Sequence, residues 1–71
     1  MDAIVERFGH NARSARHRLG LTQEELAARA GLAVVQVSRI ERGAREIRLT
    51  TLVRLVRALE VSPTELLDGL Y

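Results

Sequence analysis

The sequence has no cysteine, one proline and only two aromatic residues, Phe8 and Tyr71. Without cysteine, neither a disulfide nor a thiolate zinc site can form. No apolar run approaches the roughly 20 residues of a membrane span. The first residues also lack the basic and then apolar layout of a secretion signal. We therefore expect a cytoplasmic protein that does not act at a membrane.

Patterns typical of metal, cofactor and catalytic sites are missing as well. His10 and His17 would share a helix face, but they stand about 10 Å apart along its axis, which is too far for one metal. Gly43 is followed by alanine and not by the Gly-Lys-Ser or Gly-Lys-Thr of a phosphate-binding loop. A chain of 71 residues has room for one domain and little room for a catalytic cleft. We expect no enzyme, no cofactor and no small-molecule ligand.

The charges are unevenly distributed along the chain. All eleven basic residues are arginine and lie between Arg7 and Arg57, whereas residues 58–71 contain three acids and no base. One end of the molecule could therefore meet a polyanion that the other end would repel. Plain solvation of helix faces explains the same charges, so the distribution alone does not decide between the two.

Apolar residues recur at helical spacing almost throughout, and no segment alternates as a strand would. Glycines follow several of these segments, where helices commonly end. Thr22 and Glu25 form a capping-box pattern, as do Ser62 and Glu65, whereas Ala33 is a poor cap because its methyl group accepts no hydrogen bond. The pattern predicts an all-α chain with five helices, at about residues 3–19, 23–30, 34–42, 49–59 and 63–68.

Two of the predicted helices, over about residues 22–42, have the spacing of a helix-turn-helix. Gly31 can adopt the left-handed conformation that a tight turn requires, and Ala27 lets the two backbones approach closely. Apolar residues fill the wedge between the helices, and all these features together at this spacing are a specific signal. They are Leu26, Ala30, Leu32, Val37 and Ile40.

The same stretch resembles a known family. The lambda repressor/Cro-type family, also called the xenobiotic-response-element family, has a helix-turn-helix similar to residues 21–27, Gly31 and residues 37–43, which here read LTQEELA, G and VSRIERG. The likeness extends upstream to Phe8-Gly9 and Arg16. Downstream it includes Leu52, Leu55, Ala58-Leu59, Val61-Ser62 and Leu66-Leu67. The run of residues 42–49 most resembles the controller proteins of restriction–modification systems. The resemblance implies a single compact lambda-repressor-like domain over residues 1–71.

The resemblance also implies that the second helix of the motif lies in the major groove of duplex DNA. Its outward positions here are Val34, Val35, Gln36 and Arg39. Arg39 could bind guanine through O6 and N7, and Gln36 could address adenine. The two valines depart from the family, which usually has polar residues there. They could pack on thymine methyl groups, or instead against a partner or the adjoining loop.

Further residues are expected to hold the DNA backbone or the fold. Family members use the position of Gln23, at a helix N-terminus, to bind a phosphate, and such an end favours anions. Family members also pair the positions of Arg16 and Glu41 in a partly buried ion pair, which would orient Arg16 towards the phosphates. The remaining phosphate candidates, each of which could equally be a solvated charge, are Arg13, Arg42, Arg45 and Arg48.

A homodimer is expected for two reasons. A domain this small buries only about 60% of its unfolded surface, so a second copy would supply additional core. Several apolar residues within about residues 47–71 also have no obvious burial in a monomer, although scattered surface apolar residues are normal. They are Ile47, Leu49, Val53, Leu67, Leu70 and Tyr71. A two-fold dimer would place two reading helices about 34 Å apart on a near-palindromic site.

Two functions therefore remain open. The first is a homodimeric transcriptional regulator that binds a specific duplex operator, as an autoregulatory controller protein does. The second is a protein-interaction module with the same fold, such as the antitoxin of a toxin–antitoxin pair. The valines at positions 34 and 35 favour the second function, because their side chains cannot form hydrogen bonds with the edge of a base.

Overall fold

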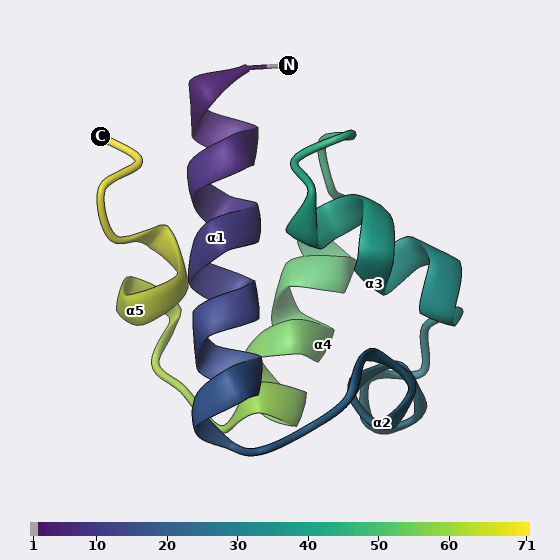
Figure 1. Cartoon of the computed structure of the whole chain (residues 1–71). Coiled ribbons are helices and arrows are strands. Elements are labelled where there is room, and N and C mark those ends of the chain that lie inside the picture. The colour runs from purple at the N-terminus through teal and green to yellow at the C-terminus, as the bar shows by residue number, and fades with distance from the viewer. Residues whose placement is uncertain (1) are drawn as a thin grey trace.

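Five helices make up the computed structural model, which describes residues 2–71. They are α1 (Ala3–Arg18), α2 (Gln23–Ala30), α3 (Val34–Glu41), α4 (Leu49–Leu59) and α5 (Pro63–Leu67) (Figure 1). The all-α, five-helix fold predicted from the sequence is confirmed, and residues 2–71 contain no strand. No helix within this range has the length and apolar character needed to cross a membrane.

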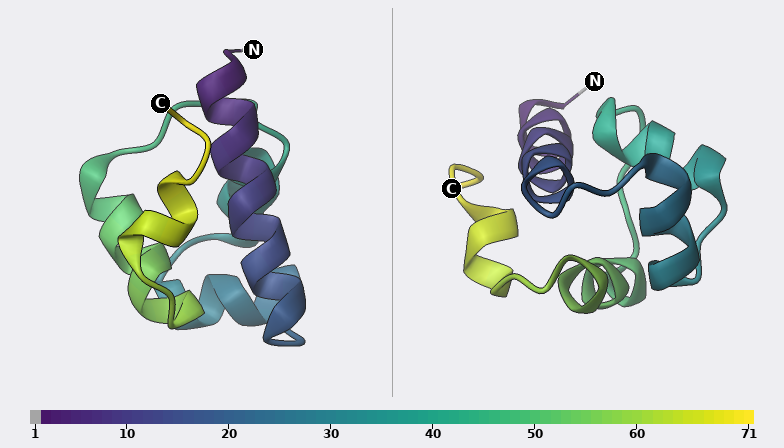
Figure 2. Two further views of the ribbon diagram at one scale, coloured as in Figure 1. Left: turned by 90° about the vertical axis from the view of Figure 1, so that its left-hand side faces the viewer. Right: turned by 60° about the horizontal axis from the view of Figure 1, so that its bottom comes forward.

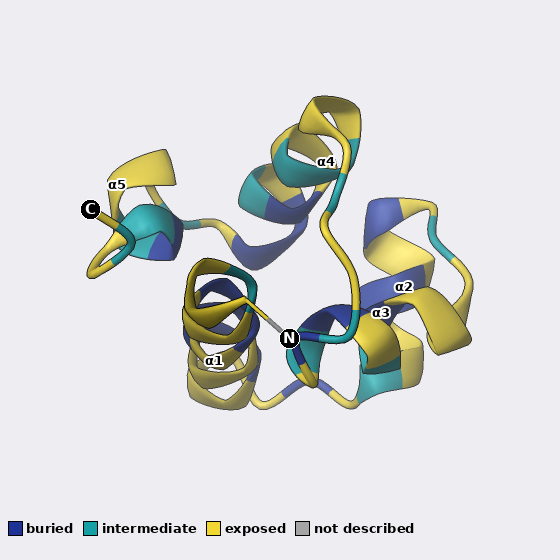
Figure 3. Cartoon of the chain, turned by 90° about the horizontal axis from the view of Figure 1, so that it is seen from above, coloured by how far each residue is buried: buried dark blue, intermediate teal, exposed yellow. Residues whose placement is uncertain are grey.

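The first helix holds the others together. It packs against α3, α4 and α5, while α2 packs against α3 and α4. As Figures 2 and 3 show, α5 lies on one side of α1 and the α2–α3 pair lies on the other. The C-terminus of the chain lies near the end of α1 at which that helix begins (Figure 1). The helix-turn-helix therefore occupies one flank of the molecule and α5 the opposite flank.

The helix starts follow the predicted caps. The hydroxyl oxygens of Thr22 and Ser62 accept the backbone N–H groups of Glu25 and Glu65, at 3.0 and 3.3 Å. Each bond satisfies one of the amide groups that a helix leaves unpaired in its first turn. The predicted boundaries differ from the structure mainly at C-terminal ends. There α1, α3 and α5 each stop one residue early, because the next residue is the half-helical cap position.

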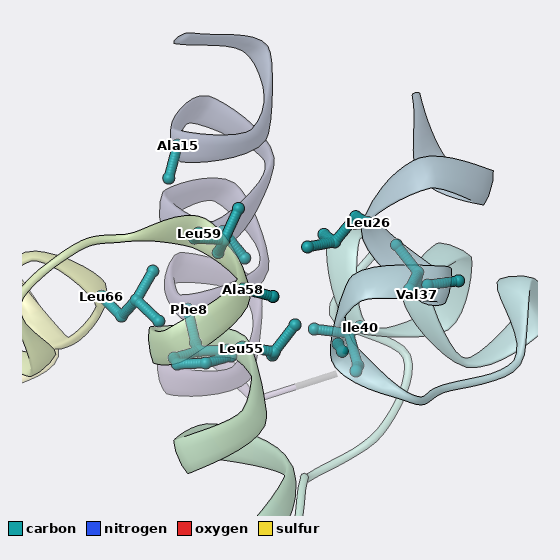
Figure 4. Close-up of a cluster of buried hydrophobic side chains, with 12 residues drawn as sticks. Phe8, Ala15, Leu26, Val37, Ile40, Leu55, Ala58, Leu59 and Leu66 are labelled. Atoms are coloured by element: carbon teal, nitrogen blue, oxygen red, sulfur yellow. The ribbon is translucent and has the colours of Figure 1, made fainter. Parts of the chain in front are cut away.

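The core lies where the helices converge, and Figure 4 shows most of it. Apolar residues at helical spacing predict the core, and most of those residues are buried: Phe8, Ala12, Ala15, Leu21, Leu26, Ala27, Ala30, Val37, Ile40, Leu55, Leu59 and Leu66. Four other expected core residues are only partly buried and pack against this cluster: Leu32, Leu52, Val56 and Val61. Ala58 is also buried, which the sequence pattern missed.

One expectation about apolar residues is wrong. Ile47, Leu67 and Leu70 were expected to have no burial in a monomer, but they are partly buried and pack against the core. The loop before α4 and the turn after α5 fold back over α1, so these three side chains converge beside Phe8. In contrast, Leu49 is 75% exposed, Val53 41% and Tyr71 101%.

A buried asparagine ties α5 to α1. The Nδ2 of Asn11 donates to the carbonyl oxygens of Leu66 and Asp68, at 2.9 and 2.8 Å. Asn11 itself is only 9% exposed, so these bonds replace the water that its amide group loses on folding. A helix of only five residues is not stable alone, and this contact helps to hold α5 in place.

A glycine permits a close crossing of α1 and α3. A Cβ atom on Gly9, in the middle of α1, would clash with the carbonyl oxygen of Ile40 and lie 2.9 Å from that of Glu41. Gly9→Ala should therefore lower the free energy of unfolding by about 1–3 kcal/mol, since overpacking outweighs the gain in helix propensity. Urea unfolding followed by circular dichroism measures this loss. The exposed neighbour variant His10→Ala should stay within about 0.5 kcal/mol. Equal stability of Gly9→Ala and wild type would contradict the close crossing.

Candidate nucleic-acid interface

The turn between α2 and α3 depends on Gly31. Its backbone is left-handed, with φ of 68°, and its N–H donates to the carbonyl oxygen of Ala27. The N–H of Leu32 donates to the same oxygen at 2.9 Å. These two bonds end α2 and redirect the chain within three residues, so that α3 begins at Val34. The sequence expectation for this turn therefore agrees with the structure.

The outer face of α3 is open to solvent. Val34 is 44% exposed and Val35 48%, and Gln36 and Arg39 are exposed as well. Val37 and Ile40 lie on the opposite face and are buried against the core (Figures 3 and 4). The residues expected to read bases thus share the face of α3 that a ligand can reach.

The N-terminus of α3 is capped by an unusual route. Ala33 provides no side-chain hydrogen bond to the helix. Instead, the Oε1 of Gln36 accepts the backbone N–H of Ala33 at 2.8 Å. Only the reciprocal half of a capping box is therefore present, since alanine cannot supply the other half.

An ion pair joins α1 to α3, and the structure brings the expected partners together. The Nε and Nη2 of Arg16 donate to the two carboxylate oxygens of Glu41, at 2.7 and 2.9 Å. The Nη1 of Arg16 donates to the carbonyl oxygen of Leu21 at 2.8 Å. Both side chains are buried, at 10% exposure for Arg16 and 4% for Glu41. The hydrogen bond to Glu41 raises the pKa of Arg16 above its ordinary value, so the guanidinium stays charged.

This burial bears on a second expectation about Arg16. The sequence also placed it among the phosphate-binding residues, on the basis that the ion pair would turn it towards DNA. In the structure its donors point into the fold, towards Glu41, Leu21 and the ring of His17. These bonds engage at least three of the five N–H donors of the guanidinium, which favours a structural role, and the expected phosphate contact stays a prediction.

Two side-chain hydrogen bonds stabilise the first turn of α2. Glu25 accepts the backbone N–H of Thr22 at 2.8 Å, and this bond lowers the pKa of the Glu25 carboxyl. The Nε2 of the half-buried Gln23 donates to the Oε1 of Glu41 at 3.1 Å. Gln23 is therefore connected through Glu41 to Arg16. The sequence analysis did not foresee this contact, because residues 18 apart in the chain show no local signal.

The expected phosphate-binding arginines fall into two groups. Arg45 and Arg48, together with the expected base-reading residue Arg39, line one cavity of about 480 Å³ between α3, the following loop and the start of α4. Arg13 and Arg42 are exposed but do not line it. Arg54, which the sequence analysis missed, also lines the cavity and donates to the Gly31 carbonyl oxygen at 3.2 Å. Only the fold brings Arg54 to the turn, since 23 residues separate it from Gly31.

The acids near the C-terminus are neutralised within the fold. Asp68 lies 3.5 Å from Arg7, and Glu60 lies 3.3 Å from Arg29. Glu65 pairs with Arg18. The expected repulsion of a polyanion by this end is therefore weakened, because each acid has an arginine partner from α1 or α2. Within residues 2–71, no carboxylate pairs with the remaining arginines, which are Arg13, Arg39, Arg42, Arg45, Arg48, Arg54 and Arg57.

The sequence profile of a known family decides what kind of protein this is. The profile described as helix-turn-helix matches residues 13–66. The chain belongs to the helix-turn-helix family. The match includes both helices of the motif, the turn at Gly31 and the whole of α4. The resemblance to the lambda repressor/Cro-type proteins, stated on the sequence alone, is confirmed.

Named relatives agree with this assignment. An uncharacterised HTH-type transcriptional regulator, y4dJ of Sinorhizobium fredii (strain NBRC 101917 / NGR234), is 45% identical over 58 residues, which cover 82% of this chain and 75% of that protein. The crystal structure of the restriction–modification controller protein C.AhdI from Aeromonas hydrophila has a TM-score of 0.88 and 38% identity, over 92% of this chain and 98% of that one. The chain is thus a helix-turn-helix transcriptional regulator and not an enzyme.

A further similar structure contains DNA. It is the tetramer of the controller protein C.Esp1396I in complex with its natural 35 base-pair operator. The TM-score is 0.87 at 27% identity, and the match covers 99% of this chain and 92% of that one. This helix-turn-helix regulator therefore has the backbone fold of a protein that is known in its operator-bound state.

The buried ion pair of this helix-turn-helix regulator should dominate its stability. Glu41→Ala leaves the Arg16 charge buried and unpaired, which costs about 3–5 kcal/mol. Because a domain of this size has only about 4–10 kcal/mol of total stability, Glu41→Gln is the more informative variant. It keeps the volume and one acceptor, and should lose about 2 kcal/mol. Urea unfolding measures both variants.

The control for this experiment is Glu46→Ala. Glu46 is exposed, and within residues 2–71 it forms no ion pair. Its replacement should change the free energy of unfolding by less than about 0.5 kcal/mol. If Glu41→Gln unfolded at the same urea concentration as wild type, the pair would not carry the stability assigned to it.

Proposed function

We propose that this regulator is a homodimer that binds a near-palindromic operator in duplex DNA and controls transcription, in the manner of a restriction–modification controller protein that acts on its own promoter. The observation that carries the proposal is the exposed face of α3 beside arginines that have no carboxylate partner in residues 2–71. Because its operator is chromosomal or plasmid DNA, we place the protein in the cytoplasm.

In this proposal α3 lies in the major groove. Arg39 has five N–H donors and is free to bind guanine through O6 and N7. Val34 and Val35 offer no hydrogen bond, and their exposed methyl groups suit the methyl group of thymine. Direct readout then depends on Arg39 and Gln36, with the two valines adding apolar contacts.

The DNA backbone is held by charges around α3. Arg42, Arg45 and Arg48 lie at the end of α3 and in the loop that follows, and Arg13 adds an exposed cation on α1. Gln23 and the amide groups of the first turn of α2 supply a neutral phosphate site. If a dimer neutralises about six phosphates, the logarithm of its binding constant falls with that of salt concentration with a slope near −5.

The dimer interface is proposed on α4 and the C-terminal segment. Leu49, Val53 and Tyr71 are exposed there, and the partly buried Ile47, Leu67 and Leu70 continue the apolar surface. Large exposed apolar patches on small proteins commonly mark contact sites with other proteins. The similar structure of C.Esp1396I, a tetramer on its operator, supports an assembly of more than one copy.

The experiment that tests the proposal is selection of bound DNA. The purified protein is incubated at near-physiological salt with sheared DNA from its source, and the recovered fragments are sequenced. We expect enrichment of one near-palindromic site, above all upstream of the protein's own gene. Enrichment of no site would reject the operator-binding function. It would instead favour a protein-interaction module, for which the apolar Val34 and Val35 are the supporting feature.

Two variants, Arg39→Ala and Arg42→Ala, distinguish base recognition from binding to the phosphate backbone. Loss of a bidentate arginine–guanine contact is worth about 1–3 kcal/mol of discrimination. Because a dimer loses this contact in both half-sites, Arg39→Ala should lower the ratio of operator affinity to random-DNA affinity by about thirtyfold or more. Arg42→Ala removes one phosphate contact from each copy, so it should weaken both affinities equally and make the salt slope shallower by about two. Fluorescence anisotropy titrations measure both quantities. An equal loss on both duplexes for Arg39→Ala would contradict base reading.

Leu49→Ser tests the interface. Burial of a leucine is worth about 1.5–3 kcal/mol and occurs in both copies of a two-fold dimer, so the dimer dissociation constant should rise about a hundredfold or more. Sedimentation equilibrium measures this constant. Leu19→Ser is the matched control, since Leu19 is 39% exposed at the end of α1, away from the proposed interface. An unchanged dimer in Leu49→Ser would exclude this surface.

A further inference from the structure

The cap of α3 has a consequence for Gln36. The backbone N–H of Ala33 needs an acceptor, and the only acceptor in a glutamine side chain is its carbonyl oxygen. The 2.8 Å bond from that N–H therefore fixes which end of the amide faces inward. The Oε1 of Gln36 points to the helix start, and its NH₂ group points away from it.

Gln36 is exposed, so this NH₂ group is available to a ligand. It offers two donors and no acceptor. A bidentate contact with adenine needs both ends of the amide, since the oxygen must accept from N6 while the nitrogen donates to N7. The oxygen keeps a second lone pair, but the cap turns it towards the helix start, so the adenine contact expected from the sequence competes with the cap. At an interface from which water is displaced, abandoning the cap leaves the Ala33 N–H without a partner.

We infer that Gln36 reads DNA as a donor only, a conclusion that rests on the proposed operator-binding function. Its NH₂ group fits the acceptors of the major groove, which are purine N7, guanine O6 and thymine O4. Cytosine presents a donor, N4, at its major-groove edge, so it is excluded at this position. Ala33 touches no base in this scheme. Because its side chain cannot cap the helix, Gln36 accepts the Ala33 N–H, and this bond determines which bases Gln36 can bind.

The free protein tests the cap without DNA. The amide proton of Ala33 should exchange with solvent about five- to tenfold more slowly in wild type than in Gln36→Ala. Gln36→Glu should keep this protection, because a carboxylate accepts the same bond and a negative charge suits a helix N-terminus. Hydrogen exchange measured by two-dimensional NMR resolves this single amide. Equal exchange in wild type and Gln36→Ala would overturn the inference.

Selection from a pool of randomised duplexes tests the reading. Wild type should disfavour cytosine at one position of each half-site. Gln36→Glu keeps the cap but can only accept, so it should enrich cytosine at that same position by at least tenfold over wild type. Ala28→Glu is the control for added charge, because Ala28 is exposed on α2 and adds the same charge without a base contact. It should weaken binding yet select the wild-type base.

The bound state separates the two ways in which the inference can fail. On the operator, Ala33 should stay protected. Loss of that protection, or selection of the same base by wild type and Gln36→Glu, would overturn the donor-only reading while leaving operator binding intact. If wild type selects no site at all, the proposed function fails as well, whatever the Ala33 amide shows.

If wild type selects adenine, 7-deazaadenine should weaken binding about tenfold. Purine, which lacks the N6 amino group, should not weaken it.

Discussion

The bidentate pair of Arg16 and Glu41 is the contact on which the arrangement of the domain depends. Removing two charges from water is costly, and the cost is offset only when the partners and their remaining donors are bonded. Here the remaining nitrogen of Arg16, Nη1, donates to the carbonyl oxygen of Leu21, just before α2, and Glu41 also accepts a hydrogen bond from Gln23. One pair of side chains thus connects the end of α1, the start of α2 and the end of α3. The angle at which α3 faces outward follows from this connection.

Much of the fold could be predicted from the sequence because its signals are local. Helical spacing of apolar residues, a capping box at Thr22 and a glycine at the turn act over a few residues, and each predicted element is present. Helix ends were off by one residue, since the cap residue belongs half to the helix. The burial of Ile47, Leu67 and Leu70 could not be predicted, because it depends on how two loops fold back across α1.

The candidate site was predictable in outline for a different reason. The outward face of α3 follows from helix geometry once the buried Val37 and Ile40 are known. What the sequence could not supply were contacts between distant segments. Only the fold brings Arg54 to the turn and directs the donors of Arg16 towards Glu41 and the Leu21 carbonyl oxygen. Charge behaved in the same way. From the sequence, the acidic C-terminal segment is expected to repel a polyanion, yet in the fold each of its acids forms an ion pair with an arginine.

The hydrogen bonds of Asn11 have a consequence for how two copies could sit on DNA. They fasten α5 and the residues after it to the middle of α1, the helix that also carries Arg16. An interface formed through the C-terminal segment would therefore share one rigid support with the helix-turn-helix, with no hinge between them. The separation of the two reading helices would be set by the fold and could not adjust. Such a dimer would select for the distance between the half-sites as well as for their sequence. It would tolerate an altered spacing only if the DNA twists or bends to restore that distance.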